Sequence, residues 1–397
     1  MSSELVIGVA IADMSEFVAI DPAYGIGDQR LQIEALVEHE LRTGGLDENG
    51  GWRGLPGGIC PTLDIREFSS TSIEHKRAVA DEFARANVFA VLGARDFTYG
   101  SVRLAEVHHV PVLDVNAVPR AVFARTDPWL FTVRAAQDLV YLTYVEWAHA
   151  SGRLDRGRIG VFSDRYTAGS AAIAIARLGE LGAPVVDHIA SDGVGVGSDH
   201  DIIAARRFAE AGVDIVMPFV SGSSLAGFLR AADEIDFRPE VLDLETGEHA
   251  TDVSASVMPG RIYEGTSALV MSRIGELAAG RPLDERAEEA IRVVEQACGV
   301  PISRSGRESS GALSNILLVS DLVRILFIAL RDLGGSVDRL GLVAALERIG
   351  NLPSASGGRI TFGPGEHWGC REMREVVWRE GAWRVVGDYA PIVSAER

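Results

Sequence analysis

The sequence predicts an α/β protein built from two doubly wound lobes. Short, continuously apolar runs such as residues 88–93 are typical of strands that are buried on both faces of a parallel sheet. These runs alternate with polar loops and helical segments, and the alternation occurs in two successive halves of the chain. A repeat of this kind favours two lobes over one large sheet.

The composition is that of a globular protein with substantial cores. The chain has 397 residues, of which 47% are hydrophobic, and it is long enough for two or three domains. Its net charge of -18 is spread along the sequence without a basic block, so nucleic acid is not expected as a partner. The longest apolar stretch, residues 316–330, contains Asp321 and Arg324 and is too short to span a membrane. We expect it to be a core helix.

The first half is predicted to contain a βαβαβ arrangement. We expect strands at residues 5–10, 63–68, 88–93 and 110–113, and helices at residues 28–41, 73–85 and 101–107. Helix 28–41 is amphipathic, and the serines and threonine at residues 69–72 offer N-caps to the helix that follows them.

The pattern restarts near residues 128–133. We expect strands at residues 158–162, 184–190 and 214–219, and helices at residues 138–150, 170–181 and 199–211 and one ending at residue 232. Further helices are predicted at residues 274–296, 311–332 and 338–348. The C-terminal tail, with two apolar runs around Glu380-Gly381, is typical of a hairpin.

Polar loops follow two of the strands in the first half. Residues 94–100 follow the strand at 88–93, and residues 114–118 follow the strand at 110–113. In an open α/β sheet, ligands bind beyond the carboxyl ends of the strands, where loops and helix N-termini present N–H donors. We therefore expect these two loops to form one wall of a binding site.

Short motifs over nearly the whole chain carry a resemblance to a known family. They are Ile7-Gly8-Val9 with Tyr24-Gly25, Val91-Leu92-Gly93, Val110-Pro111-Val112-Leu113, Phe131-Thr132-Val133-Arg134 and Phe362-Gly363-Pro364-Gly365. In their order and spacing the chain resembles the type I periplasmic binding fold, in its branch similar to the branched-chain amino-acid-binding (leucine-binding) proteins of ABC importers.

The resemblance implies two discontinuous lobes with a ligand cleft between them. Lobe 1 is expected to hold residues 1–128 and 250–333, and lobe 2 residues 129–249 and 334–397. A three-strand hinge is expected near residues 125–135, 247–260 and 333–340, where Gly334-Gly335 supplies backbone freedom. Closure of the lobes on the ligand follows from this architecture.

The same resemblance implies how a ligand would be held. In amino-acid-binding relatives, hydroxyl and N–H groups of the first two loops bind the carboxylate, and an acidic residue at the place of Glu245 binds the ammonium; a desolvated carboxylate needs several donors and an ammonium needs an ionised acceptor. The alternative for Glu245 is a solvated turn carboxylate. The predicted ligand-binding residues are Arg95, Phe97, Thr98, Tyr99, Asn116, Ala117, Val118, Tyr166, Ala168, Ser221, Gly222, Glu245 and Thr246.

Several positions depart from the pattern of that family. Val118 stands near an expected small hydroxyl, and Arg95 and Asp96 replace small polar residues. Ala168 occupies the place of an expected aromatic wall, with Tyr166 two residues earlier. These departures argue against a standard branched-chain amino acid and favour a larger or differently shaped ligand, such as a carboxylate met by Arg95. The alternative is that Arg95 only pairs with Asp96 at the rim.

Other motifs are interpreted as structural. The segment 222–227 misses the Gly-x-Ser-x-Gly spacing of a nucleophile elbow, so its serines are expected to cap a helix. The glycines at residues 193–197 do not match Gly-x-Gly-x-x-Gly and are expected to form a flexible loop. His108, His109 and His367 lack metal-ligand spacing, so surface or packing roles are expected.

The cysteines and the N-terminus leave two questions open. Cys60, Cys298 and Cys370 are expected to be isolated thiols, with one disulfide and one free thiol as the alternative. The first residues show no basic segment followed by an apolar one. The protein is therefore either cytoplasmic, or it is a periplasmic or cell-surface lipoprotein whose leader is absent from this sequence.

The sequence thus predicts a solute-binding protein of an ABC importer that is not an enzyme. It is expected to close on a small polar ligand, such as an amino acid or another small carboxylate, and to deliver it to an ABC permease. No cofactor, metal, nucleic acid or membrane span is expected, and monomer and dimer both stay open. The alternatives are a cytoplasmic ligand sensor of the same fold, similar to amide sensors, and an α/β hydrolase.

Overall fold

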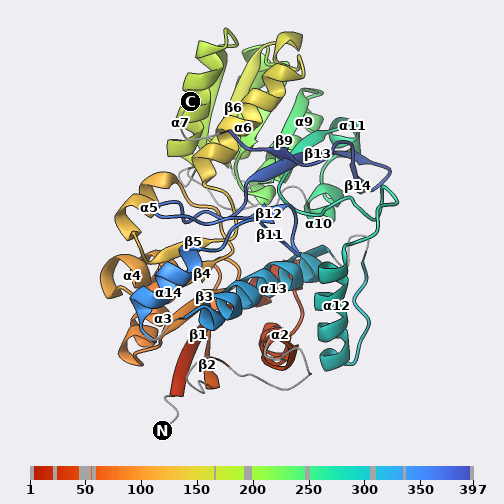
Figure 1. The fold of residues 1–397 in the computed structure, drawn as a ribbon. Helices are drawn as coiled ribbons and strands as arrows, with labels where there is room; N and C mark the ends of the chain where they lie inside the picture. The colour runs from red at the N-terminus through yellow and green to blue at the C-terminus, as the bar shows by residue number, and fades with distance from the viewer. Residues whose placement is uncertain are drawn as a thin grey trace. The chain divides into compact units, whose positions relative to one another are not determined.

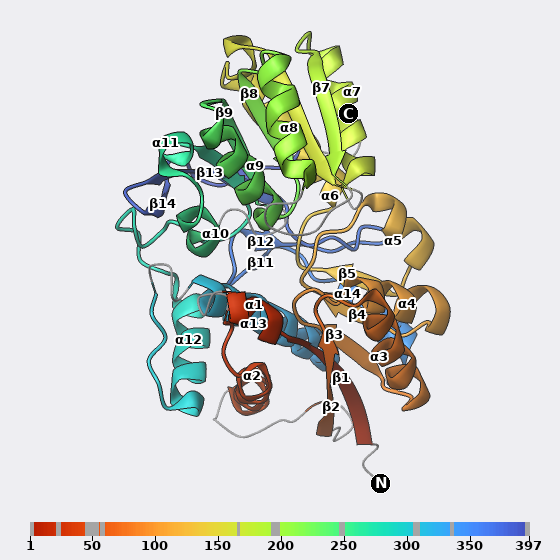
Figure 2. The same cartoon turned by 180° about the vertical axis from the view of Figure 1, so that it is seen from behind.

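A computed structural model gives the structure of most of the chain (Figures 1 and 2). The described residues are 4–20, 25–43, 55, 60–164, 167–191, 199–245, 251–304, 310–333 and 337–393. Their contacts divide the chain into unit 1, with Met1–Ala135, Leu283–Arg304 and Gly311–Arg371, and unit 2, with Ala136–Pro282, Ser305–Ser310 and Glu372–Arg397.

Unit 1 is organised around a five-stranded sheet with the order β2-β1-β3-β4-β5. All of its neighbouring strands are parallel. The strands are β1 (Glu4–Asp13), β2 (Cys60–Ser69), β3 (Ala90–Gly93), β4 (Val112–Asp114) and β5 (Leu130–Thr132). Every residue of β3, β4 and β5 is buried, as expected for strands covered on both faces. A small two-stranded pair, β11 (Leu352–Pro353) and β12 (Arg359–Ile360), also belongs to this unit.

Helices cover both faces of this sheet. They are α1 (Ser15–Ile20), α2 (Gln29–Thr43), α3 (Ile73–Arg85), α4 (Thr98–His108), α5 (Arg120–Thr126), α12 (Glu285–Cys298), α13 (Ser310–Arg331) and α14 (Arg339–Glu347). Helix α2 packs against α12, and α3 packs against α4 (Figure 1). The connection from β1 to β2 runs toward one edge of the sheet, whereas those from β2 to β3 and from β3 to β4 run toward the other edge. Because such connections are right-handed, α2 lies on the face opposite α3 and α4.

Helix α13 is the predicted core helix. Among the described residues it is the one helix long and apolar enough to cross a membrane by length and composition. Its apolar window is 67% buried inside the protein, and Ile316, Leu322 and Ile325 have no exposed surface. The expectation of a core helix is therefore confirmed by its burial.

Unit 2 contains a second, larger sheet. Its eight strands follow the order β14-β13-β10-β9-β8-β6-β7, with β15 paired to β13. The strands are β6 (Ile159–Asp164), β7 (Val185–Ser191), β8 (Ile215–Phe219), β9 (Glu240–Leu244), β10 (Ser267–Val270), β13 (Glu372–Arg379), β14 (Ala382–Val385) and β15 (Ala390–Pro391). Strands β7, β6, β8, β9 and β10 are parallel, whereas β13 is antiparallel to β10.

The helices of unit 2 also lie on two faces. They are α6 (Gln137–Ala150), α7 (Ala168–Glu180), α8 (Asp199–Glu210), α9 (Gly222–Glu234), α10 (Asp252–Ser256), α11 (Gly260–Tyr263) and the short 3-10 helix η3 (Leu154–Arg156). Figure 1 shows α6 and α7 on the near face, and Figure 2 shows α8 and α9 on the opposite one. Phe162, Phe208, Phe228, Trp378 and Trp383 belong to the core under α8 and α9.

The terminal hairpin is confirmed. Strands β13 and β14 are antiparallel, with Arg379 opposite Ala382 and the turn Glu380-Gly381 between them. Both turn residues have positive φ, 54° at Glu380 and 75° at Gly381. Two left-handed residues in a two-residue turn match the twist of the flanking strands.

The division between the units differs from the predicted lobes. Residues 129–135 belong to unit 1 because β5 pairs with β4, and residues 251–282 belong to unit 2 because β10 pairs with β9 and β13. Residues 337–371 belong to unit 1. Among described residues the chain therefore passes between units at 135/136, 282/283, 310/311 and 371/372, and only the first of these lies in a predicted hinge segment. Gly334 and Gly335 lie outside the described residues.

Two helix predictions need correction. The helix predicted at 274–296 begins only at Glu285, because Pro282 cannot continue a helix and Asp284 caps α12 by accepting from the N–H groups of Arg286 and Ala287. The short helices α1 and α5 lie in segments for which the sequence predicted no helix. By contrast, α3 has the predicted bounds, and Ser72 caps it by accepting from the N–H of His75.

Two segments that lead to unit boundaries are joined to each other within unit 1. The N–H of Thr132 donates to the carbonyl of His367 at 2.9 Å, and the N–H of Gly369 donates to the carbonyl of Thr132 at 2.7 Å. A Cβ on Gly369 would lie 3.0 Å from that same carbonyl and 2.8 Å from the Ile360 side chain. The absence of a side chain at residue 369 therefore permits this close approach.

Candidate functional site

The two predicted loops of unit 1 meet at the carboxyl ends of β3 and β4. Gly93 and Asp114, the last residues of these strands, are paired in register. The Asp114 carboxylate accepts hydrogen bonds from the Ser101 hydroxyl, and from the N–H and the side-chain amide of Asn116 at 2.7 Å each. One buried carboxylate therefore fixes both the start of α4 and the loop after β4.

Burial governs the protonation of Asp114. Its side chain is 1% exposed, and burial raises its pKa to about 6, although the hydrogen bonds from Ser101 and Asn116 act in the opposite direction. Gly93 leaves room for this group, because a Cβ there would lie 2.9 Å from the Ser101 hydroxyl and 3.0 Å from Asp114 Oδ2.

The first turn of α4 lacks a side-chain cap. Phe97 stands at the N-cap position and makes no capping hydrogen bond. Thr98 and Tyr99, which were predicted to bind ligand, are partly exposed and form the start of the helix. The N-terminus of a helix presents N–H donors and a partial positive charge, so this position suits an anion such as a carboxylate.

Two predicted side chains of unit 1 are core residues. The Phe97 ring is fully buried and packs 4.9 Å from the Phe68 ring and 6.4 Å from the Phe83 ring, measured between centroids. Val118 is 3% exposed. The Phe97 side chain therefore packs in the core, and its role in ligand binding stays a prediction. Asn116 and Ala117 are partly exposed beside Val118.

The loop between β3 and α4 carries an ion pair. Lys76 Nζ lies 3.3 Å from Asp96 Oδ2, and Lys76 also lies over the Phe68 ring at 5.8 Å. Asp96 has a φ of 65°. Arg95, its neighbour in the loop, is partly exposed. Asp96 is thus held toward α3, which is an arrangement that sequence reasoning missed.

In unit 2, a compact turn follows β6. The N–H of Thr167 donates to Asp164 Oδ1 at 3.0 Å, and the N–H of Asp164 donates to the Thr167 hydroxyl at 3.1 Å. The same hydroxyl donates to the carbonyl of Phe219, the last residue of β8. These bonds fix the start of α7, where Ala168 is partly exposed. Tyr166 lies outside the described residues.

A serine after β8 caps a helix, but it is not one of the serines of segment 222–227 for which capping was predicted. The Ser221 hydroxyl accepts from the N–H of Ser224 at 3.3 Å and lies 2.9 Å from the Ser223 hydroxyl. Ser221 is the N-cap of α9, and Gly222 is its first residue. The cap is therefore Ser221, whereas Ser223 and Ser224 lie in the first turn of α9.

Glu245 connects the ends of β9 and β10. Its Oε2 accepts from the N–H of Met271 and, at 2.8 Å, from the N–H of Ser272, while its own N–H donates to the carbonyl of Leu269 at 3.0 Å. The alternative of a solvated turn carboxylate does not describe this residue, because backbone donors hold one of its oxygens. Thr246 lies outside the described residues.

A buried ion pair supports the same strand end. Arg374, 2% exposed, donates to Glu276 Oε1 at 2.7 Å and to the Ser272 carbonyl at 3.1 Å. Its guanidinium also lies 4.4 Å from the centroid of the Tyr389 ring. Sequence reasoning missed this group.

A second buried polar group lies within β9. Asp243 is fully buried and accepts hydrogen bonds from the Tyr263 hydroxyl and, at 2.7 Å, from the N–H of Leu244. The Tyr144 hydroxyl donates to the Leu242 carbonyl nearby. Burial first, and then the charge of Asp243, raise the pKa of both tyrosines well above the usual value. Both tyrosines therefore stay protonated and act as donors.

The remaining candidates have structural roles. His108 pairs with Asp81 at 2.7 Å, the His109 ring stacks on Trp129, and the His367 ring stacks on Phe131 while its Nε2 lies 3.0 Å from Glu347. Packing and surface roles for these histidines are confirmed. Among the described residues, no group of three or more His, Cys, Asp or Glu side chains could hold a metal ion.

Cys298 is a partly exposed free thiol, and Cys370 is buried. Residues 193–197, the predicted flexible glycine loop, lie outside the described residues.

The two helix-covered sheets, largely parallel, define the type I periplasmic binding fold, as the sequence predicted. The chain is similar to a leucine-binding protein from Thermotoga maritima MSB8, with 16% identity, 99% of each chain covered and a TM-score of 0.70. It is also similar to an R. palustris ABC transporter solute-binding protein in complex with benzoate, with 16% identity, 99% of this chain and 98% of that chain covered, and a TM-score of 0.71.

A third similar structure is an ABC transporter substrate-binding protein from Desulfitobacterium hafniense in complex with Leu. It shares 16% identity, the match covers 97% of this chain and 100% of that chain, and the TM-score is 0.66. No protein-family model and no curated protein sequence matches the chain. The comparisons therefore establish the fold over nearly the whole chain.

Proposed function

We propose that this protein is the extracytoplasmic solute-binding component of an ABC importer and that its ligand is a small carboxylate. The observation that carries the proposal is the N-terminus of α4, which has no side-chain cap and lies beyond the carboxyl end of β3. Leucine and benzoate, which are bound by two proteins of this fold, both carry a carboxylate. A helix N-terminus supplies the donors and the partial charge that this group requires.

In this proposal, Thr98 and the first-turn N–H groups of α4 bind the carboxylate. The buried Asp114 positions α4 through Ser101 and positions Asn116 directly, without contacting the ligand. Because the hydrogen bonds of Asp114 hold both loops together, the loops are preorganised, and preorganisation lowers the entropic cost of binding.

The remainder of the ligand is proposed to contact loops of unit 2, so that both units bind one molecule. Ala168 and Ser221 offer a small apolar and a small polar side chain there. Glu245 supplies negative charge for an ammonium if the ligand is an amino acid, although Met271 and Ser272 already occupy its Oε2. An aromatic carboxylate would need no such partner.

Transport without chemistry on the ligand is the proposed role, with delivery to an ABC permease outside the cytoplasm. The serines that could suggest a nucleophile, Ser223 and Ser224, lie in the first turn of α9 beside its N-cap Ser221. A binding protein of this kind requires affinity and release, not a catalytic group.

The test is a calorimetric and thermal-shift screen with L-leucine, 4-methylpentanoate, benzoate and 4-hydroxybenzoate. A ligand at a hundred times its dissociation constant adds about 2.7 kcal/mol to the free energy of unfolding. We expect at least one carboxylate to raise the melting temperature and to be recovered unchanged. The proposal fails if the corresponding amides or alcohols bind equally well, or if chromatography shows turnover of the bound compound.

Joint binding by both units has its own measurement. A ligand that contacts both units favours a closed arrangement, so small-angle scattering should show a smaller radius of gyration at saturation. An unchanged radius with a ligand bound would mean that one unit binds it alone.

A further inference from the structure

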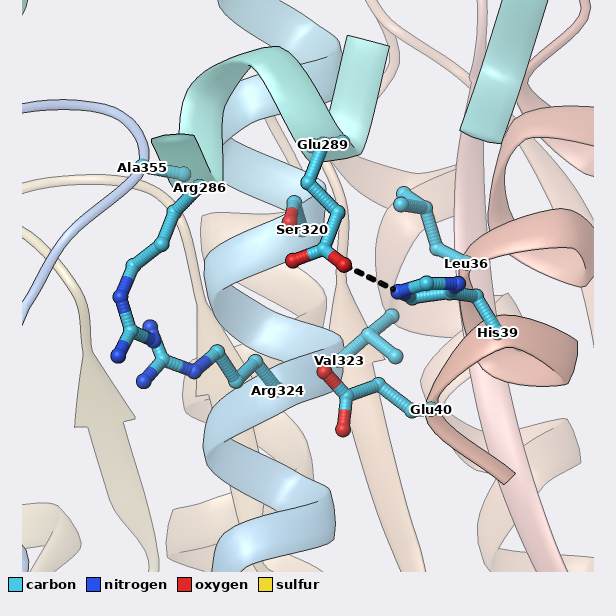
Figure 3. A pocket seen from close by; sticks show the side chains of 10 residues that line it. Leu36, His39, Glu40, Arg286, Glu289, Ser320, Val323, Arg324 and Ala355 are labelled. Atoms are coloured by element: carbon cyan, nitrogen blue, oxygen red, sulfur yellow. Dashed lines mark hydrogen bonds and ion pairs between the residues drawn. The ribbon is translucent and has the colours of Figure 1, made fainter. Parts of the chain in front are cut away.

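A pocket in unit 1 lies between α2, α12 and α13 and beside Ala355, and Figure 3 shows the residues that line it. The described residues that line the pocket include none of the predicted ligand-binding residues. Its volume is about 60 Å³, well above the roughly 10–15 Å³ that one water molecule needs. Leu36, Val323 and Ala290 give it an apolar floor, each at most 3% exposed. The pocket can therefore hold a small molecule of a few heavy atoms.

The carboxylates of the pocket already have cationic partners. Arg292 Nη2 lies 4.0 Å from Glu289 Oε1, which also contacts His39 Nε2 at 3.2 Å. Arg331 Nη2 lies 3.1 Å from Glu40 Oε2. Arg331 also donates to the Glu40 carbonyl at 2.8 Å. These acidic groups therefore do not leave an unmatched negative charge for a cation to fill.

The two arginines of the pocket lack such partners. Figure 3 shows the guanidinium groups of Arg286, from α12, and Arg324, from α13, pointing toward one another on the side away from His39. Arg324 donates to the Pro353 carbonyl at 3.1 Å, and within the described part of the chain neither guanidinium has a carboxylate at ion-pairing distance. Two guanidinium groups that face one another repel unless an anion lies between them.

We propose that this pocket binds a small oxyanion, a phosphate or a carboxylate, between Arg286 and Arg324. The planar guanidinium donates two parallel N–H bonds to such an anion, and the Ser320 hydroxyl on the same wall supplies a further donor. The apolar floor lowers the local dielectric and strengthens these contacts. The site is distinct from the proposed solute site and does not depend on it.

An anion bound in the pocket would affect the segment that follows α14. Arg324 binds the carbonyl of Pro353, and Ala355 both lines the pocket and donates its N–H to Asp321 Oδ1 at 2.7 Å. An oxyanion on Arg324 would therefore change the exchange of amide hydrogens at residues 352–357. This is a second readout that does not depend on heat of binding.

The experiment is isothermal titration calorimetry with inorganic phosphate and, separately, with acetate. We expect one site per chain for at least one of these anions, weakened at least about tenfold by Arg286→Gln and by Arg324→Gln, since each removes one charge-assisted bidentate donor. Arg30→Gln is the control, because Arg30 lies on α2, has a side chain that is 52% exposed, and is not part of the pocket wall. It should change affinity less than about twofold. The anion that binds more tightly identifies the preferred chemistry.

Two outcomes would overturn the proposal. One is no saturable binding of either anion up to about 20 mM, a concentration at which even a weak specific site would fill. The other is binding that survives both pocket variants but is lost in Arg95→Gln, which would locate the anion at the loop after β3. Arg286→Gln keeps the test decisive even if Arg324→Gln does not fold, because the Arg286 side chain makes no hydrogen bond or ion pair within the described residues.

Discussion

Glu245 and Ser272 are joined by a hydrogen bond of 2.8 Å from the Ser272 N–H to Glu245 Oε2, and this contact ties the end of β9 to the end of β10. The residue proposed to face an ammonium therefore also closes a strand end. Any test of its binding role has to separate these two functions.

Glu245→Gln and Glu245→Ala separate them. The glutamine oxygen can still accept from the N–H groups of Met271 and Ser272, so the melting temperature should stay close to that of the native protein. Alanine leaves both donors without this acceptor and should cost about 1 to 3 kcal/mol of stability. If calorimetry shows that leucine binds, the glutamine variant should bind it at least about tenfold more weakly.

The outcome for Glu245→Gln depends on the ligand. A benzoate-type ligand has no ammonium, and its affinity should then change little. Loss of affinity for a ligand without a cation would contradict the proposed role of Glu245.

Thr98→Val tests the carboxylate site. Valine keeps the shape of threonine but removes the hydroxyl at the first residue of α4, so affinity for a carboxylate should fall by a factor that corresponds to about 1 to 3 kcal/mol. Thr43→Val, which removes a hydroxyl at the end of α2, is the control and should not change affinity. Equal affinities in the two variants would remove Thr98 from the site.

Asp114 should make stability depend on pH. Its pKa is raised to about 6 in the folded protein from 3.8, so between these values the folded state binds more protons than the unfolded state. The stabilisation is therefore complete below about pH 4 and is lost as pH rises through 6, by an amount on the order of 3 kcal/mol. Asp114→Asn should remove this dependence while its side-chain oxygen still accepts from Ser101.

The measurement is the difference in melting temperature between native protein and Asp114→Asn at pH values from 4 to 7. We expect the difference to shift in favour of the asparagine variant as pH rises. Asp236→Asn, at an exposed carboxylate, is the control and should show a flat difference. A flat difference for Asp114→Asn as well would mean that the buried carboxylate has an ordinary pKa.

The pair of Arg374 and Glu276 should be strongly coupled. Removing one partner leaves a buried charge without its counter-charge, so Arg374→Met or Glu276→Gln should each destabilise the protein by about 3 to 5 kcal/mol. The double variant should cost less than the sum of the two changes, because it leaves neither charge buried. Additive losses in chemical denaturation would show that the two side chains act independently.

The fold was predictable because apolar runs, and the glycine or proline residues that end them, are local signals. Helix α3 and the hairpin around Glu380-Gly381 illustrate this, since a capping serine and a two-residue turn act within a few residues. The lobe boundaries were less predictable. The place of β10 depends on pairing with β13, more than a hundred residues later, and no local pattern specifies such a partner.

The candidate site shows the same limit. Its loops were located from strand ends, but the sequence does not tell which side chain of a loop turns inward. Phe97 is in the core, and the loop residue Asp96 pairs with Lys76, which lies twenty positions earlier on helix α3. The bond between Glu245 and Ser272 is likewise a contact between two separate strands.

The late position of β13 in the chain has a consequence for biosynthesis. Unit 1 includes residues up to Arg371, and β13, which lies between β10 and β14 in the sheet of unit 2, begins at Glu372. A ribosome adds about 5 to 20 residues per second. Almost the entire polypeptide is therefore synthesised before either unit contains all of its residues. Until then, the edge of β10 that β13 will cover is open to other partners, so a chaperone or a translocation machine would meet an unfinished chain for most of its synthesis.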